Sequence, residues 1–272
     1  MIEIKAITEL DQLKLLKSEY LDQTTAPLDG MWLCGFVPLA SHFGFYKNST
    51  SIGYCCINDE GNLLQFYLRS NDSSEESSLL MNMLSGKYDH LPKIEGAFVS
   101  TAEPDFLSYC FDNFSSFKVN AIMYQLNKGA KLSINKDINW TLRPVDPENL
   151  SEAVEFGVSS IGAPKDWLAQ YWSNLIQRQE LFGCWLDDEL IGTGENREFD
   201  DFQEGYTDIG VIVSQQQRGK GLATWILQQL VQMAIEKSLE PICSTERDNI
   251  GAQKAIIRAG FVARKRIVEF MV

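Results

Sequence analysis

The sequence has little histidine and no long apolar segment, and each shortage excludes whole classes of function. Only His42 and His90 occur among the 272 residues, and neither has metal-ligand spacing around it. A zinc site or a Ser–His–Asp hydrolase is therefore not expected. No run of 18 apolar residues occurs, so no membrane span is predicted. The first ten residues also lack the basic and apolar stretches of an export signal, which predicts a cytoplasmic location.

Basic residues are also scarce. The chain has 24 lysine and arginine residues against 37 aspartate and glutamate residues, a net charge of −13. Such a balance argues against the basic surface that nucleic acids and anionic membranes require. Nine of the acids fall in residues 187–208, where Arg197 is the single base. A solvated acidic hairpin is the usual origin of such a run, and a site for a cationic partner is the alternative.

The rest of the composition is that of a globular protein. Hydrophobic residues make up 44% of the chain and charged residues 22%. The six cysteines include no Cys-x-x-Cys pair and lie mostly in apolar segments. We therefore expect reduced cysteines in a core, with no disulfides and no metal site.

Hydrophobic periodicity predicts a similar order of elements in both halves. In the first half we expect strands at residues 2–4, 43–46, 51–57, 63–68, 97–100 and 119–126, and helices at 10–21, 75–84 and 104–111. In the second half we expect helices at 147–158, 165–178, 222–237 and 249–259, and strands at 182–186, 190–199, 207–213, 242–245 and 261–271. This order indicates a mixed, three-layer α+β fold present in two copies. We place domains at residues 1–130 and 141–272, with a linker at 131–140.

A glycine-rich turn opens the long helix of the second half. Residues 215–223 read Gln-Gln-Gln-Arg-Gly-Lys-Gly-Leu-Ala and follow an apolar strand. Such a turn presents backbone N–H groups at the positive end of the helix dipole, which suits a phosphate group. The spacing matches neither a Walker A loop nor a dinucleotide-binding fingerprint. The turn therefore predicts a phosphate ligand of another kind.

Two motifs in the second half resemble those of the GNAT N-acetyltransferase superfamily. Residues 218–223 match the family's Q/R-x-x-G-x-G/A signature, and residues 249–252 with Gly260 and Phe261 resemble its second motif. The first half is similar only in its order of elements, because residues 70–74 replace the glycine-rich turn. The resemblance implies the GNAT acyl-CoA N-acyltransferase fold in two tandem domains. The first would be a degenerate copy without the pyrophosphate loop.

The resemblance also implies a co-substrate, acetyl-CoA or another acyl-CoA. Its pyrophosphate would lie on the amides around residues 218–223. Its pantetheine arm would run beside one strand where residues 207–213 and 242–245 splay apart. The residues expected to bind it are Val211, Ile212, Val213, Arg218, Gly219, Lys220, Gly221, Leu222, Ala223 and Asn249.

Amine acylation needs a base, an oxyanion site and an acid. Asp208 and Glu195 are the candidate bases, alone or through water, although surface carboxylates are the commoner role for such residues. The N–H groups near Val211 and Ile212 are candidates for the oxyanion site. Ile256 occupies the position where the family often has a tyrosine acid. The alternatives are that Ser244, Thr245 or water supplies this proton, or that the domain is inactive.

The predicted function is an N-acetyltransferase that moves the acetyl group of acetyl-CoA to a primary amine of a small molecule or peptide. We expect a cationic acceptor and a monomer or homodimer. The alternative is a non-catalytic acyl-CoA sensor or interaction module. A third interpretation keeps the enzyme but gives it a hydroxyl acceptor or a donor with a longer acyl chain. In this third interpretation Trp167, Tyr171 and Trp172 would line the acceptor pocket, although their helical spacing is more typical of a core.

Overall fold

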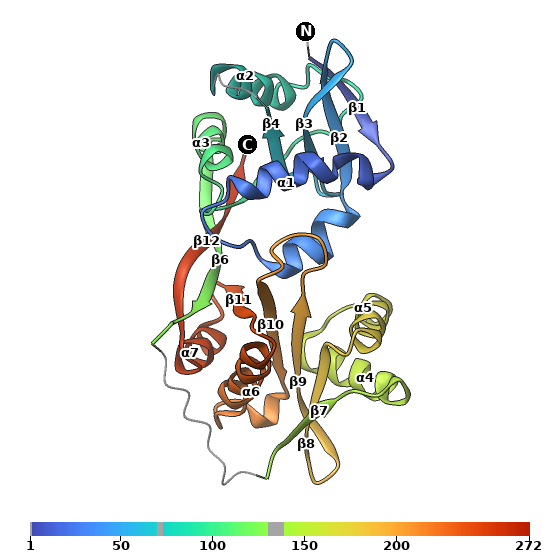
Figure 1. Ribbon diagram of the computed structural model, residues 1–272, viewed down its shortest axis with the longest axis vertical. Coiled ribbons are helices and arrows are strands. Elements are labelled where there is room, and N and C mark those ends of the chain that lie inside the picture. The colour runs from blue at the N-terminus through green and yellow to red at the C-terminus, as the bar shows by residue number, and fades with distance from the viewer. Residues whose placement is uncertain (1, 70–72, 130–138) are drawn as a thin grey trace. The chain divides into compact units, whose positions relative to one another are not determined.

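The computed structural model of the chain describes residues 2–69, 73–129 and 139–272. Residues 131–138 of the expected linker lie outside these ranges. The chain divides into two compact units (Figure 1). Unit 1 consists of Met1–Ile122 and Lys265–Val272, and unit 2 of Met123–Arg264. The last residues of the chain thus belong to unit 1, whereas the expected boundaries placed them in the second domain.

The sheet of unit 1 begins with five strands in sequence order. These are β1 (Glu3–Ile7), β2 (Ser41–Lys47), β3 (Thr50–Ile57), β4 (Asn62–Leu68) and β5 (Gly96–Ser100), followed by part of β12 (Phe261–Met271). Only β4 and β5 pair in parallel within this set. β6 (Ser116–Leu126) begins in unit 1 and ends in unit 2, and β12 runs from unit 2 into unit 1.

Helices cover both faces of this sheet. On one face Leu80 of α2 (Ser73–Leu84) and Phe106 of α3 (Pro104–Asn113) pack into a core that includes Phe45. On the other face Tyr20 of α1 (Lys14–Asp22) packs against Tyr54. Successive strand residues point to opposite faces, so β3 supplies both cores. The helical segment Trp32–Phe36 and the short turn Val37–Leu39 were not predicted, because each is too short for a clear helical period.

The sheet of unit 2 has the order β6-β11-β10-β9-β8-β7. Its strands are β7 (Thr141–Pro144), β8 (Leu181–Leu186), β9 (Glu189–Glu198), β10 (Tyr206–Val213) and β11 (Glu240–Glu246), with the end of β6. β10 pairs with β11 in parallel, and β7, β8, β9 and β10 are joined by antiparallel pairing. β7, a short and mostly exposed strand, was not predicted.

In unit 2, α4 (Leu150–Ile161) and α5 (Lys165–Gln177) pack on one face of the sheet, where Trp172 is fully buried. α6 (Leu222–Glu236) packs closely on the other face and contacts α7 (Ile250–Arg258). Glycine in β9 permits this approach, because a Cβ at Gly194 would lie 2.9 Å from Ile226 and 3.1 Å from Leu230. The predicted three-layer α+β architecture is confirmed.

Two structural findings concern the apolar segments and the cysteines of the sequence. No helix in the described ranges is long and apolar enough to cross a membrane. In the described structure five of the six cysteines are buried and Cys34 is exposed, and none is assigned to a disulfide. Core packing therefore explains five cysteines but not Cys34.

Candidate active site

The glycine-rich turn between β10 and α6 has the backbone conformation that its glycines predict. Gly219 has φ +79° and Gly221 has φ +91°, a region that residues with a Cβ rarely adopt. A Cβ built at either position would meet nothing within 4 Å, so the turn faces open space. Gly221 is also the N-cap residue of α6, with no side chain of its own to cap the helix.

The first backbone N–H groups of α6 therefore remain available to a ligand. The first turn of a helix lacks intrahelical acceptors for its amides. Within the described residues, no hydrogen bond is recorded for the amides of Gly219, Gly221, Leu222 and Ala223. The Arg218 guanidinium donates to the carbonyl oxygen of Ser160 at 2.9 Å. This bond ties the turn to the end of α4.

β10 leaves its parallel neighbour less than halfway along the strand. The register between β10 and β11 covers residues 206–208 and ends at the pair Asp208 and Ile242. β9 pairs with β10 along the whole of residues 207–213. In the described structure Val211, Ile212 and Val213 thus have a strand partner on one side. This is where the two strands were expected to splay apart.

The two candidate bases are buried, so their interpretation as surface carboxylates is wrong. Glu195 is 7% exposed and Asp208 is 1% exposed. The Arg197 guanidinium lies between them, donating from Nη2 to Asp208 Oδ2 at 2.6 Å and from Nη1 to Glu195 Oε2. A buried carboxylate requires such a partner, because desolvation of an unpaired charge is costly.

Two aromatic residues of α5 complete the surroundings of Glu195. The Tyr171 hydroxyl donates to Glu195 Oε2 at 2.8 Å, and the Trp172 indole N–H donates to Oε1 at 2.8 Å. Burial and the nearby Glu195 charge raise the pKa of Tyr171, which keeps its hydroxyl protonated. Burial alone would lower the pKa of Arg197, but the charges of Asp208 and Glu195 raise it well above its usual value. The guanidinium therefore stays charged.

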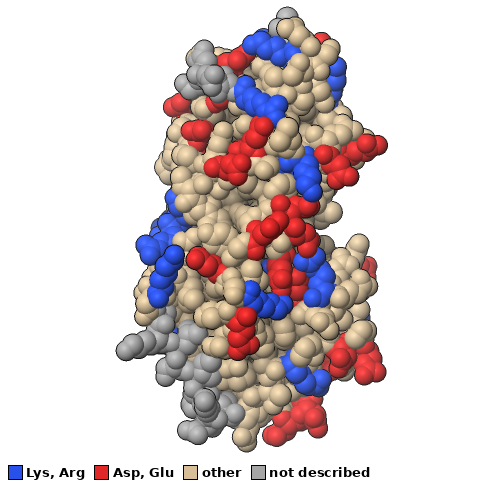
Figure 2. Space-filling view, viewed as in Figure 1, with Lys and Arg blue, Asp and Glu red and all other residues tan. Residues whose placement is uncertain are grey.

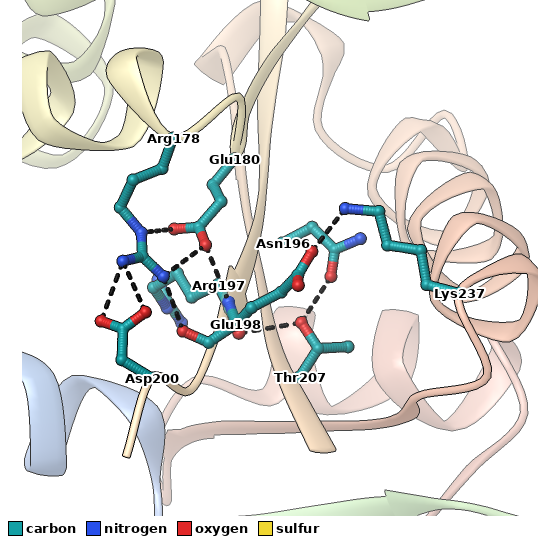
Figure 3. A network of polar contacts seen from close by, with 8 residues as sticks. All are labelled: Arg178, Glu180, Asn196, Arg197, Glu198, Asp200, Thr207 and Lys237. Carbon is teal, nitrogen blue, oxygen red and sulfur yellow. Dashed lines mark hydrogen bonds and ion pairs between the residues drawn. The ribbon is translucent and has the colours of Figure 1, made fainter. Parts of the chain in front are cut away.

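A second set of contacts, drawn in Figure 3, surrounds the end of β9. Arg178 contacts Glu180 at 2.8 Å and Asp200 at 2.8 Å, and Lys237 forms an ion pair with Glu198. On the face drawn in Figure 2, side chains of both charge signs lie close together. Four acids of residues 187–208 therefore contact a basic side chain: Glu195, Glu198, Asp200 and Asp208. The run as a whole is not a solvated acidic hairpin.

The aromatic residues of α5 divide between core and surface. Trp172 is fully buried, as the core interpretation predicts. Trp167 is 40% exposed and stacks on Tyr171, with ring centroids 5.1 Å apart and planes 16° from parallel. Tyr171 thus contacts both the exposed Trp167 indole and the buried Glu195 carboxylate.

Residues 249–252 of the second motif lie at the start of α7, as the sequence predicts. The Asn249 side chain accepts a hydrogen bond from the Ala252 amide at 3.1 Å, so it caps the helix. Ile256 is buried in the same helix at 4% exposure. Ser244 and Thr245, the hydroxyl residues considered in its place, are half-buried on β11. No group of three potential metal ligands occurs among the described residues.

Comparison with known families places both halves of the chain in one superfamily. The model described as acetyltransferase (GNAT) family matches residues 148–261, and the model described as acetyltransferase (GNAT) domain matches residues 9–127. The prediction that the first half is a second GNAT-like domain is thus confirmed. Residues 70–72, at the place of its missing turn, lie outside the described ranges.

Solved structures agree. The GNAT-family acetyltransferase from Colwellia psychrerythraea is 44% identical, with a TM-score of 0.93 and 99% of each chain covered. A GCN5-related N-acetyltransferase from Sphaerobacter thermophilus is 12% identical, with a TM-score of 0.65 and coverage of 98% of this chain and 94% of that one. A tandem GNAT protein from the clavulanic acid biosynthesis pathway is 11% identical, with a TM-score of 0.70 and coverage of 100% and 98%. These two distant structures share the fold.

The protein is a tandem-domain acetyltransferase that belongs to the GNAT family. A search of curated proteins found no match.

Proposed function

We propose that unit 2 binds acetyl-CoA, or another acyl-CoA, and transfers the acyl group directly to a primary amine of a small molecule or peptide. The open turn at residues 218–221, with positive φ at both glycines, carries this proposal. It supplies uncommitted backbone N–H groups at a helix N-terminus, the environment that a pyrophosphate favours. The first half offers no such glycine-rich turn in its sequence.

The remaining donor contacts follow from the same geometry. Lys220 and Arg218 are exposed beside the turn and supply positive charge to the phosphates. The pantetheine arm would lie along Val211, Ile212 and Val213, where β10 has left β11. Asn249 would reach it through its side-chain nitrogen, since its oxygen accepts from Ala252.

The reaction forms one bond and breaks one. The neutral amine nitrogen attacks the thioester carbon, the C–S bond breaks, and an amide and a CoA thiol result. One proton leaves the amine and one reaches the thiolate. Backbone N–H groups near Val211 and Ile212 would stabilise the oxygen that gains negative charge.

Asp208 and Glu195 are the groups we assign to proton removal, directly or through water. Of the two, Glu195 accepts hydrogen bonds from Tyr171, Trp172 and Arg197. These three donors engage both of its oxygens, and Asp208 accepts a hydrogen bond from the same Arg197 guanidinium.

The acid that protonates the thiolate is assigned to Ser244, Thr245 or water. Ile256 has no proton to give. This feature favours a second candidate function, a non-catalytic acyl-CoA sensor. Titration calorimetry with acetyl-CoA tests donor binding, and absence of binding at millimolar ligand contradicts both functions. Thiol release across a panel of amines, amino acids, aminoglycosides and peptides separates them, because a sensor binds acetyl-CoA and releases no thiol with any acceptor.

A further inference from the structure

Arg197 contacts both candidate bases from the middle of the sheet of unit 2. It lies directly opposite Asp208 in the antiparallel register of β9 and β10, while Glu195 lies opposite Gly210. One nitrogen of its guanidinium donates to each carboxylate. Arg197 is itself 8% exposed, and its Nε has no recorded partner in the described structure.

A bridging cation is needed at this place for an electrostatic reason. Glu195 and Asp208 lie on neighbouring strands, on the same face, and both are buried. Two carboxylates in one buried site favour protonation of one of them, and a cation between them opposes it. Arginine suits this role because its planar fork can donate to two acceptors at once, whereas lysine carries a single point charge.

The glycine at position 210 brings this pair against the strand that we assign to the donor. A Cβ at Gly210 would lie 3.3 Å from Arg197 Nη1 and 3.5 Å from Glu195 Oε2. Gly210 immediately precedes Val211 and Ile212, whose amides we assign to the oxyanion site. The guanidinium and the carboxylate thus pack on the backbone next to the proposed reaction centre.

We propose that Arg197 is a positioning residue, which keeps the Glu195 and Asp208 carboxylates charged and holds them against β10 at Gly210. This inference rests on the proposed function, in which one of these carboxylates accepts the proton of the amine. Arg197 acts through them and does not touch the reacting atoms. The titratable groups that face it are Glu195 from β9, Asp208 from β10 and Tyr171 from α5.

The first test follows the ionisation of Glu195 without any acceptor. The Trp172 indole N–H donates to Glu195, so its proton–nitrogen NMR signal reports the charge on that carboxylate. The signal is assigned with Trp172→Phe and followed against pH in the full-length wild type, Arg197→Lys and Arg197→Gln. We expect the midpoint of its change to rise by about 1–3 pH units in Arg197→Gln, which removes the cation, and by less in Arg197→Lys, which keeps it. An unchanged midpoint in folded Arg197→Gln overturns the proposal.

Arg197→Lys is the variant less disruptive to folding, because it keeps the positive charge and removes only the planar guanidinium that bridges the two carboxylates. Arg264→Gln is the control, because Arg264 is exposed and has no recorded contact in the described structure. It should leave the Trp172 signal unchanged.

The second test measures the reaction. With an acceptor that releases thiol from acetyl-CoA, Arg197→Gln should lower kcat/KM at neutral pH by at least about tenfold. The acidic limb of its pH profile should move to higher pH, and the Kd for acetyl-CoA should stay within about twofold. A uniform loss at every pH would indicate a structural role and overturn the proposal. A wild type that binds no acetyl-CoA overturns the proposed function instead, and the NMR result still decides on Arg197.

Discussion

Replacing Gly221 by glutamate is expected to weaken binding of acetyl-CoA by at least about 10-fold to 100-fold while leaving the protein folded. Gly221 has φ +91°, and nothing lies within 4 Å of a Cβ built there. A side chain at this position meets no steric obstacle, and the folding cost is the strain of the left-handed backbone alone. That strain is about 1–2 kcal/mol for a residue with a Cβ. A domain with a stability of about 5–15 kcal/mol tolerates it.

The effect on the donor is larger because the new carboxylate lies where the pyrophosphate is expected. Two unit charges 4 Å apart interact by about 1 kcal/mol in water and about 4 kcal/mol near a protein surface. Repulsion of about 1.4–3 kcal/mol weakens binding by about 10-fold to 100-fold. Occlusion of the amides at the start of α6 adds to this loss.

Titration calorimetry with acetyl-CoA at fixed ionic strength measures the affinity, and circular dichroism confirms the fold. Gly86→Glu is the matched control, since Gly86 in unit 1 has φ +71° and open space around its Cβ position. It carries the same charge change and similar backbone strain. Wild-type affinity in folded Gly221→Glu, or an equal loss in Gly86→Glu, would refute the assignment of the turn to the donor.

Three further changes give separate outcomes. Asp208→Asn should lower kcat in the thiol-release assay more than it lowers the calorimetric affinity for acetyl-CoA. Gly210→Ala should also lower kcat, because the new Cβ would lie 3.3 Å from Arg197 Nη1, a tight contact that pushes the guanidinium away. Burial raises the pKa of Glu103 from 4.5 to about 8, so the stability from its neutral form is present below pH 4.5 and lost as pH rises through about 8. Glu103→Gln should therefore be more stable than the wild type above that pH in urea unfolding.

Controls keep these outcomes distinct. Equal loss of turnover and affinity in Asp208→Asn would remove Asp208 from the proton-transfer role. Gly205→Ala is the control for Gly210→Ala, because a Cβ at Gly205 meets nothing within 4 Å. In unit 1 the Glu103 carboxyl accepts the Ser100 amide at 2.5 Å and the Tyr20 hydroxyl. If the wild type and Glu103→Gln lose stability in parallel from acid to alkaline pH, Glu103 is not the cause.

Structural features that are set by residues close together in the sequence were predictable from the sequence. The turn at residues 218–221 has the backbone that its two glycines indicate, and α6 begins at Leu222 as the apolar pattern requires. Asn249 caps α7 because a side chain of this type bonds an amide three residues on. β7 was not predicted, because a four-residue exposed strand has too few side chains to show a period.

The environment of the candidate bases was not predictable in the same way. Glu195 and Asp208 lie in a strongly acidic stretch, and the charge count alone favours solvated carboxylates. Glu195 is covered by α5, whose Tyr171 is 24 residues away in sequence, and Asp208 is paired with Arg197 of the neighbouring strand. Sequence spacing gives no sign of that contact. The one available signal was Arg197, the single base among nine acids.

The sequence by itself determined the family, the three-layer α+β architecture and the place and conformation of the glycine-rich turn. These depend on periodicity, short motifs and the φ preferences of glycine, which act over a few residues. Only the tertiary structure decided that Glu195 and Asp208 are buried partners of Arg197, and that the end of β12 belongs to unit 1. Burial and strand pairing join residues far apart in the chain, and their free energy depends on neighbours that no local pattern identifies.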